Sequence, residues 1–174
     1  LNEQLAYPVG KRKDEVGELG RHAVDMQRSL RELVEKDALT GLYNRRYGEK
    51  RLKQVQKDAD SYGMPFCIAI GDIDYFKHVN DTYGHEWGDR VLTQIARIMA
   101  ERMRREGYAA RWGGEEFLLV FMDQGLQDAA ETLRKLQNEI RDTEFTYNEK
   151  EKFRVTMTFG ICESSGENTD ELLR

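Results

Sequence analysis

Acidic side chains gather at two points of the sequence, and each point adjoins an apolar run. Asp72 and Asp74 end the run FCIAIGDID, and Glu115 and Glu116 begin the run EEFLLVF just after a pair of glycines. If the two runs are neighbouring strands, three or four carboxylates converge at one edge of a sheet. Like charges that close either shift one another's pKa or bind a metal ion. Because consecutive strand side chains point to opposite faces, only one of the two glutamates is expected to join Asp72.

Hard oxygen ligands that leave room for water and phosphate suit Mg²⁺ better than zinc. The histidines give no zinc alternative, since they are scattered and none lies near a cysteine. After Asp72 the chain continues to Lys77 through a tight turn, which can present backbone N–H groups to phosphates beside the lysine charge. Metal, phosphate cradle and carboxylate together are the components of nucleotidyl transfer. Taken singly, the DID and GGEE motifs also fit a solvated acidic turn.

The composition suits a helix-rich globular domain with perhaps one appended segment. The chain has 174 residues, of which 34% are charged and 39% hydrophobic, and its net charge of −5 argues against a general nucleic-acid coat. No apolar run approaches the ~20 residues that cross a bilayer, and the first residues show no signal peptide. Cys67 and Cys162 lie in apolar stretches and are expected to be free thiols in the cytoplasm.

Hydrophobic periodicity predicts the elements that must position these side chains. An amphipathic helix is expected to end at Gly63, before Pro65, and a polar loop is expected over 75–89. The predicted order is helix 45–63, strand 66–74, helix from about 88 to 105, strands 108–112 and 115–122 joined by a tight hairpin turn, helix 126–143 and strand 152–162. This order predicts an α+β or α/β sandwich with helices on a central sheet.

The first segment, about residues 13–36, carries a heptad pattern. Its apolar positions are Val16, Leu19, Ala23, Met26, Leu30 and Leu33, spaced alternately by three and four. The narrow stripe between charged flanks favours a two-stranded coiled coil, and the alternative is a helix lying on its own domain.

Three motifs occur together at compatible spacing: DALTGLYNRR (37–46), GDIDYFKHVNDTYGHEWGD (71–89) and RWGGEEF (111–117). They strongly resemble the GGDEF domain, the catalytic domain of diguanylate cyclases, here in its GGEEF form, from Asp37 to about Gly160. The resemblance implies condensation of two GTP into cyclic di-GMP with release of two pyrophosphates. It also implies a palm-like, ferredoxin-like α+β fold with a central, mostly antiparallel sheet flanked by helices. The chain then divides into a signalling helix, 1–36, and a catalytic domain, 37–174.

The resemblance implies a metal site and a catalytic group at the carboxylates. Asp72 and Glu116 would ligate Mg²⁺, or Mn²⁺ in its place, and the Ile73 carbonyl would assist. Glu115 would lie beside the reacting 3′-hydroxyl, either as a ligand of a second metal or as proton acceptor.

The resemblance also implies that Asn80 and Asp89 read the guanine edge. An aspartate accepts from guanine N1–H and N2–H₂, which adenine does not offer, so Asp89 favours guanine. The structural alternative for the two residues is an Asx-turn and a helix N-cap in a polar loop.

The other implied substrate contacts form three pairs: Leu39 and Leu92 as an apolar pocket wall, Phe76 and Lys77 as phosphate contacts, and Gly113 and Gly114 as a turn that approaches the nucleotide closely. As alternatives, the two leucines are core residues, and Asp37 forms an ion pair with Arg45-Arg46 that fixes the junction. We assign no catalysis to His78 or His85, and Trp87 and Trp112 are expected to be packing residues.

The sequence departs from the family pattern at two points. Many members carry an Arg-x-x-Asp product-inhibition site upstream of the GGEEF turn, but here Gly107 stands where the Asp belongs after Arg104, so we expect this feedback to be absent or weak. The chain also ends at DELLR, before a last helix that in the family carries a phosphate-binding Lys and Arg.

Residues 14–19, DEVGEL, resemble the second helix of a HAMP module, which implies an upstream sensor, often in a membrane-bound receptor. A homodimer through the N-terminal helix is then expected, with GTP and cyclic di-GMP as ligands and no nucleic acid as partner. Three alternatives remain open: an inactive GTP- or cyclic-di-GMP-binding module, another nucleotide cyclase or polymerase-like enzyme on this fold, and a purely structural dimerisation domain.

Overall fold

The computed structural model describes residues 15–148 and 151–164, without the side chains of Glu15 and Val16. It divides into two compact units between Lys36 and Asp37. The first unit contains the helix α2 (Glu15–Glu35). Residues 13 and 14, with which the heptad segment and the HAMP-like motif were predicted to begin, lie outside the described residues.

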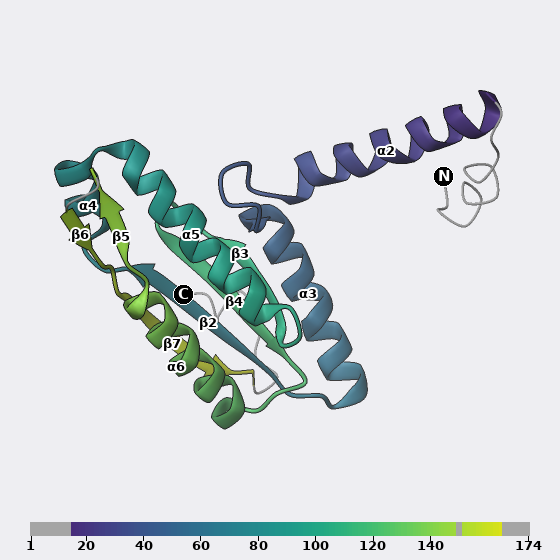
Figure 1. The fold of residues 1–174 in the computed structure, drawn as a ribbon. Coiled ribbons are helices and arrows are strands. Elements are labelled where there is room, and N and C mark those ends of the chain that lie inside the picture. The colour runs from purple at the N-terminus through teal and green to yellow at the C-terminus, as the bar shows by residue number, and fades with distance from the viewer. Residues whose placement is uncertain (1–14, 149–150, 165–174) are drawn as a thin grey trace. The chain divides into compact units, whose positions relative to one another are not determined.

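The second unit combines helices with a central sheet (Figure 1). Its elements are, in chain order, β1 (Tyr43–Asn44), α3 (Arg45–Tyr62), β2 (Phe66–Ile73), α4 (Phe76–Tyr83), α5 (His85–Met103), β3 (Gly107–Arg111), β4 (Glu116–Met122), α6 (Leu126–Asp142), β5 (Phe145–Tyr147), β6 (Glu151–Phe153) and β7 (Met157–Glu163). The predicted α+β fold is confirmed.

The main sheet has five strands in the order β1-β3-β4-β2-β7. Strands β1 and β3 are parallel, and every other neighbouring pair is antiparallel. The strands β5 and β6 form a separate two-stranded hairpin. The two longest apolar runs of the sequence, β2 and β4, are therefore neighbours in the middle of the sheet.

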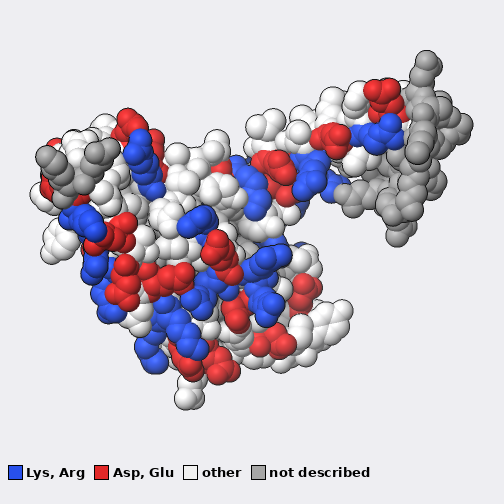
Figure 2. All heavy atoms as spheres, in the orientation of Figure 1, with Lys and Arg blue, Asp and Glu red and all other residues white. Residues whose placement is uncertain are grey.

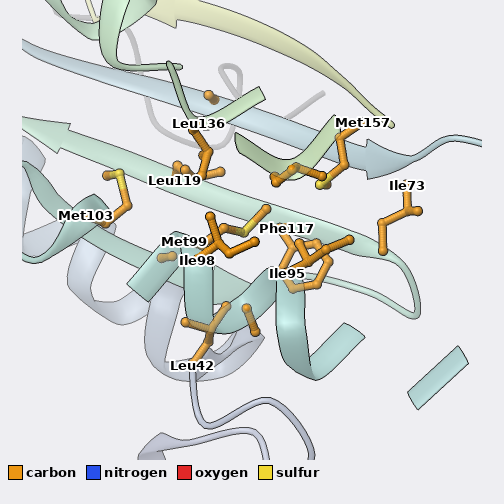
Figure 3. Packing of buried hydrophobic residues seen from close by; sticks show 14 of the residues in the cluster. Leu42, Ile73, Ile95, Ile98, Met99, Met103, Phe117, Leu119, Leu136 and Met157 are labelled. Atoms are coloured by element: carbon orange, nitrogen blue, oxygen red, sulfur yellow. The ribbon is translucent and has the colours of Figure 1, made fainter. Parts of the chain in front are cut away.

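Both faces of the sheet are covered, which explains why β4 is apolar at consecutive positions. Phe117 and Leu119 point to the face that carries α5 and α6, where they pack with Ile95 and Met99 of α5 and Leu136 of α6 (Figure 3). On the other face, the alternate residues of β4 pack with α3, and the members of this smaller cluster are Leu52, Val55, Phe66, Ile68, Tyr108, Ala110, Trp112, Leu118 and Val120.

Helix α3 has the ends that its sequence predicts. The side chain of Asn44 accepts a hydrogen bond from the Tyr47 N–H at 3.0 Å and caps the first turn. Gly63 ends the helix with a φ of 66°, and its N–H bonds to the carbonyl of Ala59.

The predicted polar loop over 75–89 is wrong. The segment forms α4 and the first turn of α5, which meet at Gly84 with a φ of 86°. Phe76 and Val79, one turn apart, are buried in the core and hold the otherwise polar α4 in place.

The predicted strand 152–162 is interrupted. Residues 154–156 leave the strand conformation, so the segment forms β6 and β7 instead of one strand. Val155 is buried at this interruption. The hairpin β5–β6 was not predicted.

Cys67 is buried and Cys162 is half-buried, and both are free thiols. Among the described residues, no helix is long and apolar enough to cross a membrane.

Candidate active site

Asp72 and Glu116 are direct partners across the antiparallel pair β2–β4. Directly opposite residues have Cβ atoms about 4.5–5.5 Å apart and point to the same face, so the two carboxylates lie side by side. Both side chains are exposed at this end of the sheet. One ion can contact both.

Glu115 occupies the turn directly before β4. Its carbonyl accepts a hydrogen bond from the Ile73 N–H at 3.4 Å, which ties the turn to the end of β2. Burial, the Asp72 carboxylate and the Glu116 carboxylate raise the pKa of Glu115. Burial, Glu116 and Asp74 likewise raise the pKa of Asp72. The end of the sheet is therefore a region of mutually repelling negative charge.

No side chain in the described parts of the chain compensates this charge, because neither Asp72, Glu115 nor Glu116 forms an ion pair there. Asp74 is held differently, since it accepts hydrogen bonds from the hydroxyls of Thr156 (2.6 Å) and Thr158 (2.7 Å). The other three carboxylates are therefore available to bind a cation.

The donor set fits a hard divalent cation. Two carboxylates and a backbone carbonyl are oxygen ligands of the kind that Mg²⁺ takes while it retains water and binds phosphate. Within the described ranges, no group of three or more His, Cys, Asp or Glu side chains is arranged to hold a metal ion. A metal ion at this position would therefore need further oxygen ligands, from the backbone or from a bound ligand. Gly113 leaves room for the Glu116 carboxylate, because a Cβ at this position would overlap it.

Arg111 holds the turn that carries the glutamates, and the sequence analysis did not assign it a role. Its guanidinium donates to the carbonyl of Gly113 (3.2 Å) and twice to that of Gly114 (2.9 and 3.3 Å). It also forms an ion pair with Asp37 at 3.1 Å. The predicted ion pair of Asp37 with Arg45-Arg46 is therefore wrong. A signal was present in the sequence, since an arginine that precedes a glycine pair can bond the carbonyls of the turn that follows.

Arg45 of the junction has other partners than the predicted one. Arg45 stacks over the Trp112 ring at 4.8 Å and pairs with Glu49 on α3. Trp112 is buried, as expected for a packing residue.

Asn80 and Asp89 lie on two different helices that meet at Gly84. Asn80 is in α4 and Asp89 is in the second turn of α5, so neither is the Asx-turn or N-cap residue of the structural alternative. A Cβ at Gly88 would overlap Oδ1 of Asn80, so the amide lies against the backbone beside Asp89. Neither side chain makes a hydrogen bond to the described residues. Both are free to bind a ligand.

Of the two predicted phosphate contacts, only Lys77 has an exposed side chain. Phe76 is 6% exposed and belongs to the core, so a phosphate contact at this position is limited to the backbone. In the described chain no acceptor takes the backbone N–H groups of Phe76 and Lys77. They are the unpaired first-turn donors of α4, at the positive end of its dipole.

A family model described as "Diguanylate cyclase, GGDEF domain" matches residues 34–174. The chain belongs to the GGDEF family. Residues 113–117, which read GGEEF, lie within the matched range.

Curated GGDEF relatives are much longer than this chain. The response regulator PleD of Caulobacter vibrioides is 38% identical over 144 residues, which cover 82% of this chain and 32% of PleD. The diguanylate cyclase DosC of Escherichia coli is 28% identical over 149 residues, which cover 86% of this chain and 30% of DosC. The chain spans about a third of the length of these relatives.

Solved GGDEF structures share the fold. The coiled coil and GGDEF domain of DgcB from Caulobacter crescentus, in complex with c-di-GMP, has a TM-score of 0.81 at 28% identity, and the match covers 92% of this chain and 85% of that one. Diguanylate cyclase SiaD of Pseudomonas aeruginosa, in complex with its activator SiaC, has a TM-score of 0.79 at 36% identity, with coverages of 90% and 60%.

The structure also locates the predicted apolar pocket wall and the predicted inhibitory site. Leu92 is buried and Leu39 packs against the same cluster, which fits the core alternative, and their role as a pocket wall stays a prediction. Arg104 is exposed in the turn after α5. Gly107 has a φ of 155°, and a Cβ there would overlap the Val120 carbonyl, so this backbone does not accommodate the inhibitory-site Asp.

A hollow elsewhere on the surface contains none of the predicted site residues. Its volume is about 510 Å³, and it is lined by α3 and Met122.

Proposed function

We propose that this chain is the catalytic part of a diguanylate cyclase, which converts two GTP into cyclic di-GMP and two pyrophosphates. The observation that carries the proposal is the direct pairing of Asp72 with Glu116 next to a glycine turn, with no cationic side chain of the described residues paired to them. Family membership supports nucleotidyl transfer as the class of reaction.

Each residue has a role in this proposal. Asp72, Glu116 and the Ile73 carbonyl hold Mg²⁺, which neutralises phosphate charge when it is bound. Glu115, whose raised pKa suits a proton acceptor, receives the proton of the 3′-hydroxyl or binds a second metal.

The nucleotide is held at both ends. Lys77 and the free N–H groups at the start of α4 bind the triphosphate. Asn80 and Asp89 bind the guanine edge, and the aspartate accepts from N1–H and N2–H₂.

The product is a symmetric ring, so one GTP-loaded site cannot close it. Two sites face each other, and each 3′-oxygen attacks the α-phosphorus of the other GTP. Two phosphodiester bonds form, two α–β phosphoanhydride bonds break, and two pyrophosphates leave with the electron pairs of those bonds. Holding the two reactants in line provides much of the rate.

A second copy of the chain supplies the second site through α2. Leu19, Met26, Leu30 and Leu33 are 55–78% exposed along the heptad stripe of this helix. Pairing the stripes buries them and raises the local concentration of the second GTP. An upstream sensor in a membrane-anchored receptor would act through the same helix.

The absence of a nucleic-acid partner remains part of this proposal. On the face drawn in Figure 2, basic and acidic side chains are intermingled over the surface. A nucleic-acid interface requires a basic stripe instead.

Incubation with GTP and Mg²⁺, followed by mass detection of cyclic di-GMP, tests the proposal. Glu116→Gln should abolish the product, whereas Glu101→Gln, at an exposed position of α5, should retain it. GTP binding without product would instead favour the inactive binding module. Activity measured with ATP, GTP and ITP distinguishes the proposed diguanylate cyclase from another nucleotide cyclase.

A further inference from the structure

Five aromatic side chains join the hairpin β5–β6 to the corner between α4 and α5. The hairpin contributes Phe145, Tyr147 and Phe153, and the corner contributes Tyr83 and Trp87; we call this group the aromatic strap. Tyr83 stacks on Phe153 with ring centroids 4.2 Å apart and planes 10° apart. Phe153 in turn stacks on Phe145 at 5.3 Å. Trp87 meets the edge of Tyr147 at 5.4 Å.

The aromatic strap contacts the helices next to the residues that we propose read guanine. Tyr83 is three residues after Asn80 in α4, and Trp87 is two residues before Asp89 in α5. The corner itself is Gly84, whose N–H bonds to the Asn80 carbonyl. A movement of this corner therefore displaces both guanine-reading side chains together. Figure 1 shows the hairpin beside α4 and the first turns of α5.

The hairpin is itself held firmly, so it can act as a support. Phe145, the first residue of the hairpin, and Val155, which follows it, are buried in the main core. Glu144 forms ion pairs with Lys152 (2.6 Å) and Arg154 (3.4 Å) across its base. The strap thus connects the α4–α5 corner to the core by a second route.

One hydrogen bond adds to the stack. The Tyr83 hydroxyl donates to the Glu151 carboxylate at 3.1 Å, between the end of α4 and the start of β6. This contact is exposed.

We propose that Tyr83 and Phe153 are positioning residues for nucleotide selectivity: their stack fixes the α4–α5 corner so that Asn80 and Asp89 match the hydrogen-bonding edge of guanine. The inference rests on the proposed function. Hydrogen-bonded base recognition tolerates little displacement, and misplaced groups lose discrimination before they lose binding altogether. The hairpin is then part of the specificity of a site that it does not touch.

The test compares GTP with ITP, which lacks only the 2-amino group that Asp89 would accept from. Tyr83→Leu keeps an apolar side chain but removes the ring, and Phe153→Leu removes the same stack from the hairpin side. We expect each to lower the GTP-over-ITP preference in KM on the order of tenfold, with kcat for GTP changed by less than about threefold. Nucleotide binding measured by calorimetry should show the same loss of preference.

Two controls separate positioning from general stability. Tyr83→Phe keeps the ring and removes only the hydroxyl, so its preference for GTP over ITP should equal that of the wild type. Tyr62→Leu removes a tyrosine that is 74% exposed at the end of α3 and should change nothing.

The outcomes distinguish the two proposals. Equal losses for GTP and ITP in Tyr83→Leu and Phe153→Leu, with a lower melting temperature, would show a merely structural strap and overturn the inference. The inference is also overturned if both leucine variants retain the wild-type preference for GTP over ITP. A wild type that shows no guanine preference at all contradicts the proposed function, and the inference with it.

Discussion

The guanidinium of Arg111 forms an ion pair with Asp37, 74 residues earlier in the chain, while it donates to the carbonyls of the glycine turn before Glu115. Both side chains are largely buried, at 18% and 24% exposure. Although burial opposes it, hydrogen bonds from Thr40 and the Arg111 charge lower the pKa of Asp37. The start of the GGDEF unit and the turn with the two glutamates are therefore held by one side chain.

Arg111→Lys should reduce turnover even though it keeps the positive charge. Lysine cannot reproduce the fork that reaches Asp37 and two carbonyls at once. We expect a loss of about tenfold to a hundredfold in kcat, since small displacements of reacting groups have effects of this size. Unfolding in urea should show a loss of about 1–3 kcal/mol. Arg97→Lys on the exposed face of α5 is the matched control, and equal behaviour of the two variants would contradict the role of Arg111.

Asp37→Asn should lower stability in a pH-dependent way. A carboxylate with a lowered pKa stabilises the folded state fully above its unfolded pKa, near 3.8, and this contribution is lost as the pH falls through the lowered value. The difference in unfolding free energy between wild type and Asp37→Asn should thus be constant from pH 7 to about 5 and shrink below pH 3.8. Urea titrations at several pH values measure it. A difference that grows on acidification would contradict the ion pair.

Asp72→Asn should abolish product formation and yet stabilise the metal-free protein. Burial and the acidic neighbours raise the pKa of Asp72. The ionised carboxylate therefore destabilises the folded state at neutral pH. Because the side chain is exposed, we expect a gain in melting temperature on the order of only 1–2 °C.

With Mg²⁺ present, the wild type should have a higher melting temperature than Asp72→Asn. Added Mg²⁺ binds only the folded wild type and raises its melting temperature, whereas Asp72→Asn should respond weakly. Asp81→Asn, exposed on α4, is the control and should respond as the wild type does. An equal Mg²⁺ response in Asp72→Asn would place the ion elsewhere.

Gly107→Asp restores the letters of the inhibitory motif, but we expect it to destabilise the protein without creating product inhibition. The left-handed backbone at Gly107 and the nearby Val120 carbonyl leave no space for a side chain. A loss of about 1–3 kcal/mol is expected.

The pair Gly107→Ala and Gly160→Ala isolates the backbone effect, because nothing lies within 4 Å of a Cβ at Gly160. Only the first should be strongly destabilised. Feedback by cyclic di-GMP at micromolar concentration in Gly107→Asp would show that the turn rearranges.

The central strands were predictable because both faces of β2 and β4 are covered, so the sequence shows uninterrupted apolar runs there. The ends of α3 were predictable from its caps. Helix α4 was not, since only Phe76 and Val79 anchor eight mostly polar residues, and such a short helix is stable only through tertiary packing.

Long-range partners account for the rest of what local patterns could not predict. The pairing of Asp72 with Glu116 depends on strand order, which no single strand encodes. Arg111 and Asp37 are each ordinary in their local sequence, and only the fold brings them together. The hairpin β5–β6 follows neither period clearly, because Tyr147 and Phe153 pack on α4 and α5 while Phe145 enters the main core.

Charged residues in the stripe of α2 should make activity depend steeply on protein concentration. The variant Leu19→Glu, Met26→Glu, Leu30→Glu places like charges at facing positions of the proposed dimer. At nanomolar protein the rate per protomer should fall by at least about a hundredfold, since the second site is no longer held at high effective concentration. It should recover partly as the concentration rises. Sedimentation measured in parallel should show a monomer.

The matched control Glu18→Lys, Asp25→Lys, Glu32→Lys makes three charge changes on the same helix away from the stripe and should stay dimeric and active. A monomeric variant with an undiminished rate per protomer would rule out catalysis across a dimer held by α2.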